Sequence, residues 1–353
     1  TPIKSSAASD VYKRQALWGG ETYTMIGNHA VPVIVDAYLK GFRGFDVEKA
    51  YSAIRTSLLT NLPKSNWDVY DQYGYLPFDI IKDESVSRTL ESCYDDYCAA
   101  QLAKALGKED DYRFFTKRAG YYKNLFDREA GLMRPKDSKG NWRTPFDKLV
   151  ISHESTSGGD YTEGNAWQYT WHVQHEPDSL INMLGGEDAF ITKLDSLFIL
   201  KEVVHNEGFS SDVTGLIGQY AHGNEPSHHV AYLYRMAGKP SKTEELVNYI
   251  CKTKYLDRVD GLCGNDDCGQ MSAWYVFSAM GFYPVNPCGG EYILGAPQLP
   301  RITIELGNNK RFVVETVNYS LENIHVRKIE LNGKELTGNS ISHKDIMLSL
   351  IHI

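Results

Sequence analysis

Three segments of the chain place carboxylates, amides and imidazoles beside aromatic residues, a combination suited to acid–base chemistry. In the first segment, Glu163 lies between Asp160 and the aromatic residues Trp167 and Tyr169. Apolar surroundings disfavour the charged form of a carboxyl group and raise its pKa, as a general acid needs near neutral pH. The alternative is that Glu163 only caps an aromatic-rich helix, and spacing alone does not decide between the two.

The second segment begins at His222 and contains Asn224 and Glu225 directly before a proline. Oxygen-rich loops of this kind bind hard cations such as calcium. His228 and His229, which end the segment, form a poor zinc pair because adjacent residues on a helix diverge by about 100°. The alternative is that Asn224 or Glu225 caps the following helix while hydrogen bonds satisfy the histidines.

The third segment sets Asp266 and Asp267 between glycines, just before a predicted helix. Two such carboxylates could ligate a metal or activate water, but they could also cap the helix. The presence of all three segments in one chain is harder to explain by capping. An inverting glycoside hydrolase needs a protonated carboxyl and an ionised carboxylate roughly 6.5–9.5 Å apart, and a calcium ion could hold sugar hydroxyls.

The composition excludes several classes of protein. The chain has 353 residues, of which 42% are hydrophobic and 23% charged, so wholesale disorder is excluded. Its net charge of −8 disfavours nucleic acid as a partner, and no apolar run reaches the roughly 20 residues of a transmembrane helix. Aromatic residues make up 12%, which favours a carbohydrate or other polar ligand. The six cysteines include no CxxC pair, so a zinc ribbon is disfavoured and the redox compartment stays open.

The elements that must position these segments are mostly helices. Hydrophobic spacing and helix-end residues predict helices at 29–39, 46–58, 85–106, 112–126, 177–185, 190–197, 226–238, 242–254 and 269–280. Ser241 and Glu244 form a predicted capping box for the helix at 242–254. Beyond about residue 290, alternating residues predict strands at 301–306 and 312–315, and Asn332-Gly333 predicts a hairpin. The pattern indicates an α/α toroid, whose chemistry lies in loops at one end, followed by a small antiparallel β unit.

The three segments together closely resemble glycoside hydrolase family 92. The strings that carry the resemblance are MIGNH at 25–29, DAYLKG at 36–41, TLE at 89–91, YDD at 94–96, MRP at 133–135, YTEGNAWQYTW at 161–171, NEPSH at 224–228 and GNDDCGQMSAW at 264–274. The resemblance implies a mainly α fold, an (α/α)₆ barrel at 16–288 that is incomplete at its start, and a truncated β region at 289–347. It also implies that the family's N-terminal β-sandwich is absent. Residues 1–15 and 348–353 are expected to be non-native tails.

The resemblance also implies a calcium-dependent exo-α-mannosidase that inverts the anomeric centre. Glu163 matches the general acid and Asp267 the general base. Asn224, Glu225 and Asp267 match the region that binds calcium. The substrate contacts implied are His222, Gly223, Trp167, Asn165, Arg134 and Asn265. Gly223 stands where members that prefer α-1,2 linkages carry glutamate, so a strict α-1,2 preference is not expected.

The expected partners are α-mannoside glycans, from N-glycans or mannans, with no nucleic acid and no transmembrane segment. The resemblance implies a periplasmic, cell-surface or secreted location. An inactive fragment or carbohydrate-binding remnant of such an enzyme is the main alternative. A glycoside phosphorylase is disfavoured because no basic phosphate cradle accompanies the three segments.

Overall fold

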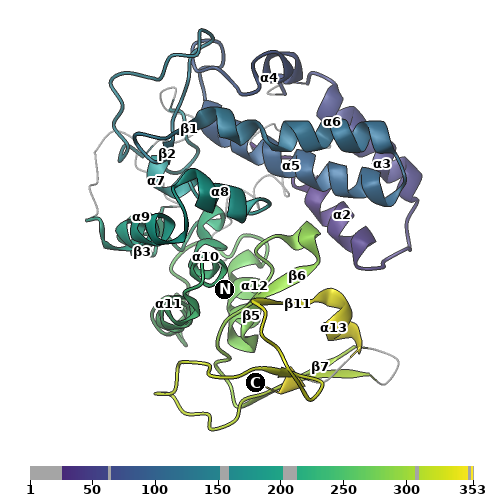
Figure 1. The fold of residues 1–353 in the computed structure, drawn as a ribbon, viewed down its shortest axis with the longest axis vertical. Helices are drawn as coiled ribbons and strands as arrows, with labels where there is room; N and C mark the ends of the chain where they lie inside the picture. The colour runs from purple at the N-terminus through teal and green to yellow at the C-terminus, as the bar shows by residue number, and fades with distance from the viewer. Residues whose placement is uncertain are drawn as a thin grey trace.

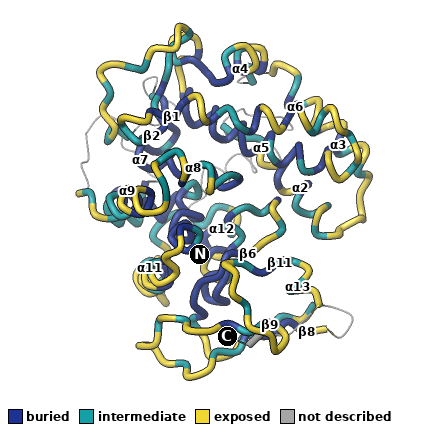
Figure 2. The backbone as a smooth tube through the Cα atoms, viewed as in Figure 1, coloured by how far each residue is buried: buried dark blue, intermediate teal, exposed yellow. Residues whose placement is uncertain are grey.

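The computed structural model describes residues 26–62, 65–151, 159–201, 213–306, 310–348 and 351–352. Its first part is a group of helices that pack around one long helix, α5 (Figure 1). These helices are α2 (Ala30–Leu39), α3 (Val47–Leu59), α4 (Trp67–Tyr73), α5 (Ser85–Ala105) and α6 (Glu109–Ala119). Most residues of α5 are buried, which explains why this helix has no distinct polar face (Figure 2).

The second part of the helical region is built from shorter helices with loops between them. Its α-helices are α7 (Ala166–Tyr169), α8 (Pro177–Met183), α9 (Glu187–Ile199), α10 (Leu233–Met236), α11 (Pro240–Thr253) and α12 (Gln270–Met280). Two small hairpins accompany them, β1 (Phe126–Asp127) with β2 (Leu132–Met133), and β3 (Leu216–Ile217) with β4 (Tyr220–Ala221). The 3₁₀ helices are η1 (Tyr121–Leu125), η2 (Glu225–Ser227), η3 (Val230–Tyr232) and η4 (Pro287–Gly289).

The C-terminal part contains two sheets (Figure 1). The first has the order β11-β6-β5 and is antiparallel, with β5 (Phe282–Tyr283), β6 (Glu291–Leu294) and β11 (Ser340–Ser342). The second has the order β10-β9-β12-β8-β7, with β7 (Arg301–Glu305), β8 (Arg311–Glu315), β9 (Glu330–Leu331), β10 (Lys334–Glu335) and β12 (Ile351–His352). Helix α13 (His343–Leu348) precedes β12. The predicted antiparallel unit is present, but β12 pairs with β8 in parallel.

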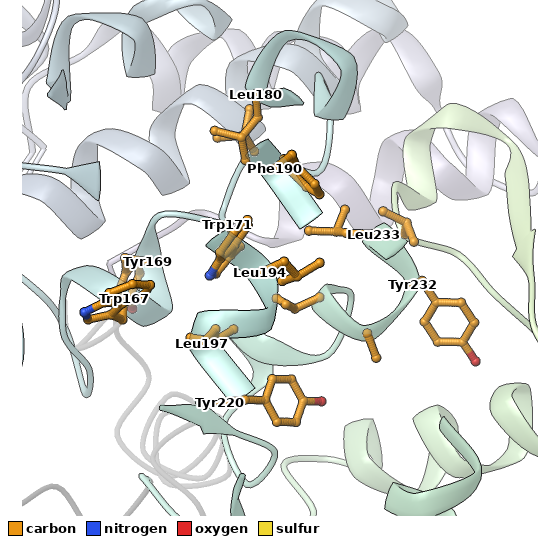
Figure 3. Packing of buried hydrophobic residues seen from close by; sticks show 14 of the residues in the cluster. Trp167, Tyr169, Trp171, Leu180, Phe190, Leu194, Leu197, Tyr220, Tyr232 and Leu233 are labelled. Atoms are coloured by element: carbon orange, nitrogen blue, oxygen red, sulfur yellow. The ribbon is translucent and has the colours of Figure 1, made fainter. Parts of the chain in front are cut away.

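Three hydrophobic clusters hold these parts together. The first is rich in aromatic residues and surrounds Trp171, which meets Phe190 edge to face at 5.4 Å between ring centroids (Figure 3). The second lies between α2, α3 and α5, and the third lies under the C-terminal sheets. The segments predicted to carry chemistry therefore sit on a packed scaffold, with Trp167 and Tyr169 as members of the first cluster.

Most predicted helices are confirmed, and Asp46 caps α3 as expected by accepting from the backbone of Lys49. The predicted helix at 112–126 is wrong in its second half. The α-helix ends at Ala119, and after Gly120 the chain forms η1 and then β1. Phe126 instead pairs with Met133 across a hairpin, so tertiary pairing outweighs the helical spacing of its side chain.

Two further predictions about helices, at 226–238 and at the start of 242–254, are wrong. The helix expected at 226–238 is broken into η2, η3 and α10, and the rings of His228 and His229 bond the backbone oxygens of His222 and Trp171. The capping box of Ser241 and Glu244 does not form, because α11 begins at Pro240 without a side-chain cap.

The predicted tails lie largely outside the described residues. This holds for all of residues 1–15 and for part of 348–353. Leu348 ends α13, and residues 351–352 form β12. In the described residues, no helix is long and apolar enough to cross a membrane.

Candidate active site

The loop that carries Glu163 is fastened to the N-terminal turn of α5. The backbone oxygen of Asp160 accepts from the amides of Val86 and Ser87, at 3.0 and 3.3 Å. The Asp160 carboxylate accepts from the Ser85 hydroxyl at 2.9 Å and pairs with the Arg143 guanidinium at 2.6 Å. These bonds satisfy the free amides of a helix start, so the helix holds the loop in place.

Two opposing effects act on the pKa of the Asp160 carboxyl group. Burial raises the pKa of Asp160, while the bond from Arg143 lowers it, and burial prevails. Arg143 makes two contacts with the carboxylate, since its Nη2 also donates at 2.9 Å. A paired arrangement of this kind fixes orientation as well as distance.

Glu163 itself is half-buried and has a backbone φ of 48°. A left-handed conformation is uncommon for a residue with a side chain and marks positions that the surrounding structure holds in place. The side-chain amide of Asn224 donates to the Glu163 backbone oxygen at 3.1 Å, which joins the first predicted segment to the second. Glu163 is not a helix cap, because Asn165 takes that role at α7.

The second segment packs tightly on the third. A methyl group added at Gly223 would lie 1.9 Å from Thr214 Oγ1, and one added at Gly264 would lie 2.7 Å from the Cα of Gly223. The amide of Gly223 also donates to the Thr214 backbone oxygen at 3.0 Å. Both glycines therefore permit a close approach of two backbones, which brings the loop of Asn224 and Glu225 against the loop of Asp267.

In the third segment, the two aspartates have different tasks. Asp266 Oδ1 accepts from the amide and the hydroxyl of Ser272, at 3.0 and 2.9 Å, and so fastens the first turn of α12. Asp267 and Cys268 have φ values of 48° and 55°, and Gly269 follows at 96°. Asp267 is half-buried, and a run of three left-handed residues is a backbone that the surrounding structure must hold in place. The Asp266 carboxylate therefore stabilises the start of α12.

Hydrogen bonds from helix α12, which begins in the third segment, connect it to the second segment. Trp274 Nε1 donates to the His228 backbone oxygen at 2.9 Å, and Gln270 Nε2 lies 3.2 Å from His228 Nδ1. Burial lowers the pKa of His228 to about 4 and that of His229 to about 3. Both rings are therefore neutral packing groups with hydrogen-bonded nitrogens, as the structural alternative predicted.

Several predicted substrate contacts are occupied by structural bonds. Both ring nitrogens of His222 bond tyrosine hydroxyls, Tyr220 at 2.7 Å and Tyr255 at 2.8 Å, and the residue is 0% exposed. Burial lowers the pKa of His222 well below its ordinary value. The two tyrosine hydroxyls fix the orientation of the His222 ring, and its contact with substrate stays a prediction.

The side chains of Asn165 and Arg134 also form hydrogen bonds within the protein. Asn165 is 0% exposed, caps α7 through its oxygen, and donates from its amide to Gln219 at 2.9 Å. Arg134 donates to Asp127 at 2.8 Å and to the backbone oxygen of Arg143 at 2.7 Å. These bonds stabilise the local fold, and the roles of Asn165 and Arg134 in sugar binding stay predictions.

The other expected contacts have different surroundings. Trp167 is buried, and Lys193 Nζ lies 4.1 Å above its ring. Gly223 is buried against Thr214 and Gly264, and Asn265 is half-buried next to Gly264. None of these observations tests whether the three residues contact substrate, so their roles stay predictions.

A cluster of charged groups for which the sequence predicted no role joins α2 to α5. Its carboxylates Glu91 and Asp95 are buried, whereas the His29 side chain is 44% exposed. His29 Nε2 lies 2.6 Å from Glu91 and its Nδ1 lies 3.6 Å from Asp95, while His172 lies 3.3 Å from the same Glu91 oxygen. Burial disfavours the charged imidazole, yet the carboxylates raise the pKa of His29 to about 10. The two histidines hold the pKa of Glu91 well below its usual range, although burial opposes this.

This cluster extends toward the predicted calcium loop, because Glu225 also favours the protonated form of His29. His29 and Glu91 both lie in motifs at 25–29 and 89–91, which was the available signal. No chemical role was predicted for His29 or Glu91, because neither motif resembles the polar loops of the three predicted segments.

The predicted calcium ligands supply suitable atoms. The side-chain nitrogen of Asn224 donates to the Glu163 backbone oxygen, and the side-chain oxygen of Asn224 takes no part in that bond. Glu225 and Asp267 add carboxylate oxygens, the donors that hard cations prefer. Within the described ranges, no group of three or more His, Cys, Asp or Glu side chains is arranged to hold a metal. A cation here would therefore need the amide, waters or substrate oxygens beside the two carboxylates.

A cavity of about 360 Å³ lies between the β1–β2 hairpin and the helices α8 and α9. Its lining includes Phe126, Leu184 and Lys193, and none of the predicted catalytic or metal residues. The candidate site is therefore defined by the three loops and not by this cavity.

Comparison with known proteins agrees with the loop geometry. The chain matches the glycosyl hydrolase family 92 catalytic domain over residues 3–349. A family GH92 α-mannosidase from Bacteroides thetaiotaomicron, solved with mannoimidazole, superposes with a TM-score of 0.89 at 43% identity, covering 95% of this chain and 44% of that one. A family GH92 inverting mannosidase from the same organism gives a TM-score of 0.83 at 35% identity, covering 98% of this chain and 49% of that one.

A curated relative from Arthroderma benhamiae, described as an uncharacterized secreted glycosidase, is 30% identical over 91% of this chain and 44% of its own length. The chain belongs to glycoside hydrolase family 92. Its mainly helical fold with small sheets matches the family's (α/α)₆ barrel catalytic domain. It spans about half the length of the relatives it matches.

Proposed function

We propose that this chain is the catalytic part of an exo-acting α-mannosidase that releases terminal α-linked mannose with inversion of configuration. The observation that carries the proposal is the meeting of the three predicted loops. The Asn224–Glu163 bond joins the first to the second, and the Gly223–Gly264 contact joins the second to the third. The similarity to two mannosidases, one of them described as inverting, supports the substrate class and the stereochemistry.

In this proposal Glu163 is the general acid and Asp267 the general base. Glu163 protonates the glycosidic oxygen, while Asp267 removes a proton from a water that attacks the anomeric carbon from the opposite face. Breaking the bond to the leaving group and forming the bond to water on opposite faces inverts the configuration. The fixed, left-handed backbones of both residues support such positioned roles.

We further propose that Asn224, Glu225 and Asp267 hold a calcium ion. Bound calcium would supply a positive centre for sugar hydroxyls and help to distort the ring. The oxygen donors of these side chains support this assignment. The proposed substrate contacts are His222, Gly223, Trp167, Asn165, Arg134 and Asn265.

The proposed substrates are α-mannosides of N-glycans or mannans, without a strict α-1,2 preference because Gly223 follows His222. A periplasmic, cell-surface or secreted location is proposed on the same basis, and the secreted relative supports export.

The test is release of mannose from α-1,2-, α-1,3- and α-1,6-linked mannobioses, with calcium and then with EDTA. Proton NMR of the first turnovers should show β-mannose, which then mutarotates. A chimaera that adds the uncovered part of the B. thetaiotaomicron α-mannosidase is assayed in parallel. Release that EDTA stops and calcium restores is the expected result.

Each other outcome has a distinct meaning. An active chimaera beside a silent chain favours the fragment alternative for the chain alone and keeps the site assignments. Silence of both preparations on every mannobiose overturns the mannosidase proposal. Release that is unaffected by EDTA overturns the calcium assignment alone.

A further inference from the structure

Two thiols that the proposed chemistry does not use lie together in the core. Cys98 in α5 and Cys288 in η4 are 0% and 3% exposed and belong to the same hydrophobic cluster. The two side chains lie close enough that Cys288 helps to raise the pKa of the Cys98 thiol, after burial as the main cause. Cys288 Sγ also donates to the Pro32 backbone oxygen at 3.4 Å, which fixes the sulfur between α2 and α5.

One face of α5 holds the segment that carries Cys288. Tyr94, Tyr97 and Cys98 stand at positions i, i+3 and i+4 and therefore share that face. The Tyr94 hydroxyl donates to Asn286 at 3.4 Å, and Tyr97 also bonds Asn286. Asn286 directly precedes η4. The two sulfurs are thus brought together by contacts other than their own.

The remaining cysteines have other surroundings. Cys93 pairs with the Tyr70 hydroxyl at 3.3 Å, and Cys251 is buried with desolvation as the sole cause of its raised pKa. Cys263 is half-buried and Cys268 is exposed, both in the loop of Asp267. Cys98 and Cys288 differ from these because each has a thiol as its neighbour.

We propose that Cys98 and Cys288 form a disulfide bond when the chain folds in an oxidising compartment. One thiolate attacks an external disulfide, such as glutathione disulfide, and expels one thiol. The second thiolate then attacks the mixed disulfide and expels the other. The two cysteines lose two protons and two electrons, and the external disulfide is reduced to two thiols.

The bond forms during folding and not afterwards. Burial raises the pKa of the Cys98 thiol, so its reactive thiolate is scarce once the core closes. The link joins positions 98 and 288, which are 190 residues apart, and restricts the unfolded chain accordingly. It would fasten α5 to the connection between β5 and β6.

The experiment refolds the reduced chain either with a glutathione redox buffer or with excess reductant. Free thiols are then counted in denaturant, and the alkylated protein is digested with chymotrypsin without reduction. Cleavage after Tyr94 separates Cys93 from Cys98, and cleavage after Tyr283 separates Cys268 from Cys288. This readout is independent of any mannosidase activity.

The expected result is two thiols fewer than the six of the sequence, and one linked pair of peptides that carry Cys98 and Cys288. Wild type should unfold several degrees higher after oxidative than after reductive refolding. Cys93→Ser should keep this difference and Cys98→Ser should lose it. Six free thiols after oxidative refolding, or a link between other cysteines, would overturn the proposal.

Discussion

Asp266 and Asp267 are neighbours in the sequence with opposite surroundings in the structure. Asp266 bonds Ser272 at the start of α12, whereas Asp267 adopts a left-handed backbone and belongs to the loop that meets Gly223. The two residues therefore provide a matched pair of variants, in which one chemical change is made one position apart.

We predict that Asp267→Asn abolishes mannose release while Asp266→Asn keeps most of it. An amide at position 267 cannot accept the proton of the attacking water, but an amide at position 266 still offers an oxygen to Ser272. Initial rates on mannobiose, with the unfolding midpoint of each variant, check the prediction. Equal losses in the two variants would argue against a base role for Asp267.

We predict that Glu163→Gln lowers kcat much more on substrates with poor leaving groups than on substrates with good ones. Loss of a general acid costs about 10²–10⁴-fold in kcat when the leaving group needs a proton. An aryl α-mannoside with an acidic phenol should lose far less. The exposed Glu129→Gln serves as a control that should leave both rates unchanged. A Glu163→Gln variant that loses the same factor on both substrates would contradict the acid role.

At the scale of elements, the start of α5 is the anchor of the acid's loop. Asp160 accepts from Ser85 on that helix and from Arg143. We predict that Asp160→Asn lowers kcat on mannobiose more than on the aryl mannoside, with KM nearly unchanged. The reason is that a displaced loop misplaces Glu163 without removing the base. Kinetics on both substrates provide the measurement.

The control for this variant is Asp111→Asn, which breaks another arginine pair, with Arg55 at 2.9 Å, far from the loop in sequence. Asp111→Asn should leave the ratio of the two rates unchanged. If Asp160→Asn reduces both rates by one common factor, then Asp160 stabilises the fold and does not position the acid.

At the scale of the whole molecule, buried carboxylates that pair with histidines connect the first helices to the second part. His29 on the α2 side contacts Glu91 and Asp95 of α5, and His172 from the second part contacts the same Glu91. A second junction lies near the sheets, where Glu244 of α11 contacts Arg235 at 3.4 Å and His325 at 3.2 Å. These junctions explain why Glu244 is not a cap: its carboxylate is used between parts of the molecule.

The His29 cluster predicts a dependence of stability on pH. The pKa of His29 is raised from 6.5 to about 10, so the folded state binds its proton more tightly than the unfolded chain. The resulting stabilisation is complete below pH 6.5 and is lost as the pH rises toward about 10. The free energy of unfolding of wild type minus that of His29→Gln, measured across this range, should shrink steadily. A difference that does not vary with pH would contradict the assignment.

Local sequence patterns were enough to predict the helical class and the change to strands near residue 290. They also identified the three segments that carry Glu163, Asn224, Glu225 and Asp267. These features depend on local spacing and turn chemistry, which are written in neighbouring residues. The sequence also allowed family membership to be anticipated, because long motif strings recur at those loops. What it could not separate was Asp266 from Asp267, since both fit a helix start.

Which polar side chains are already hydrogen-bonded within the protein became known from the packing of distant segments. His222, Asn165 and Arg134 satisfy partners that are distant in sequence or within their own turns, as with His222 and Tyr255 at 2.8 Å. The break of the helix expected at 226–238 and the Glu91 cluster have the same origin. Buried polar groups must find partners, and those partners are chosen by packing between segments that no local pattern connects.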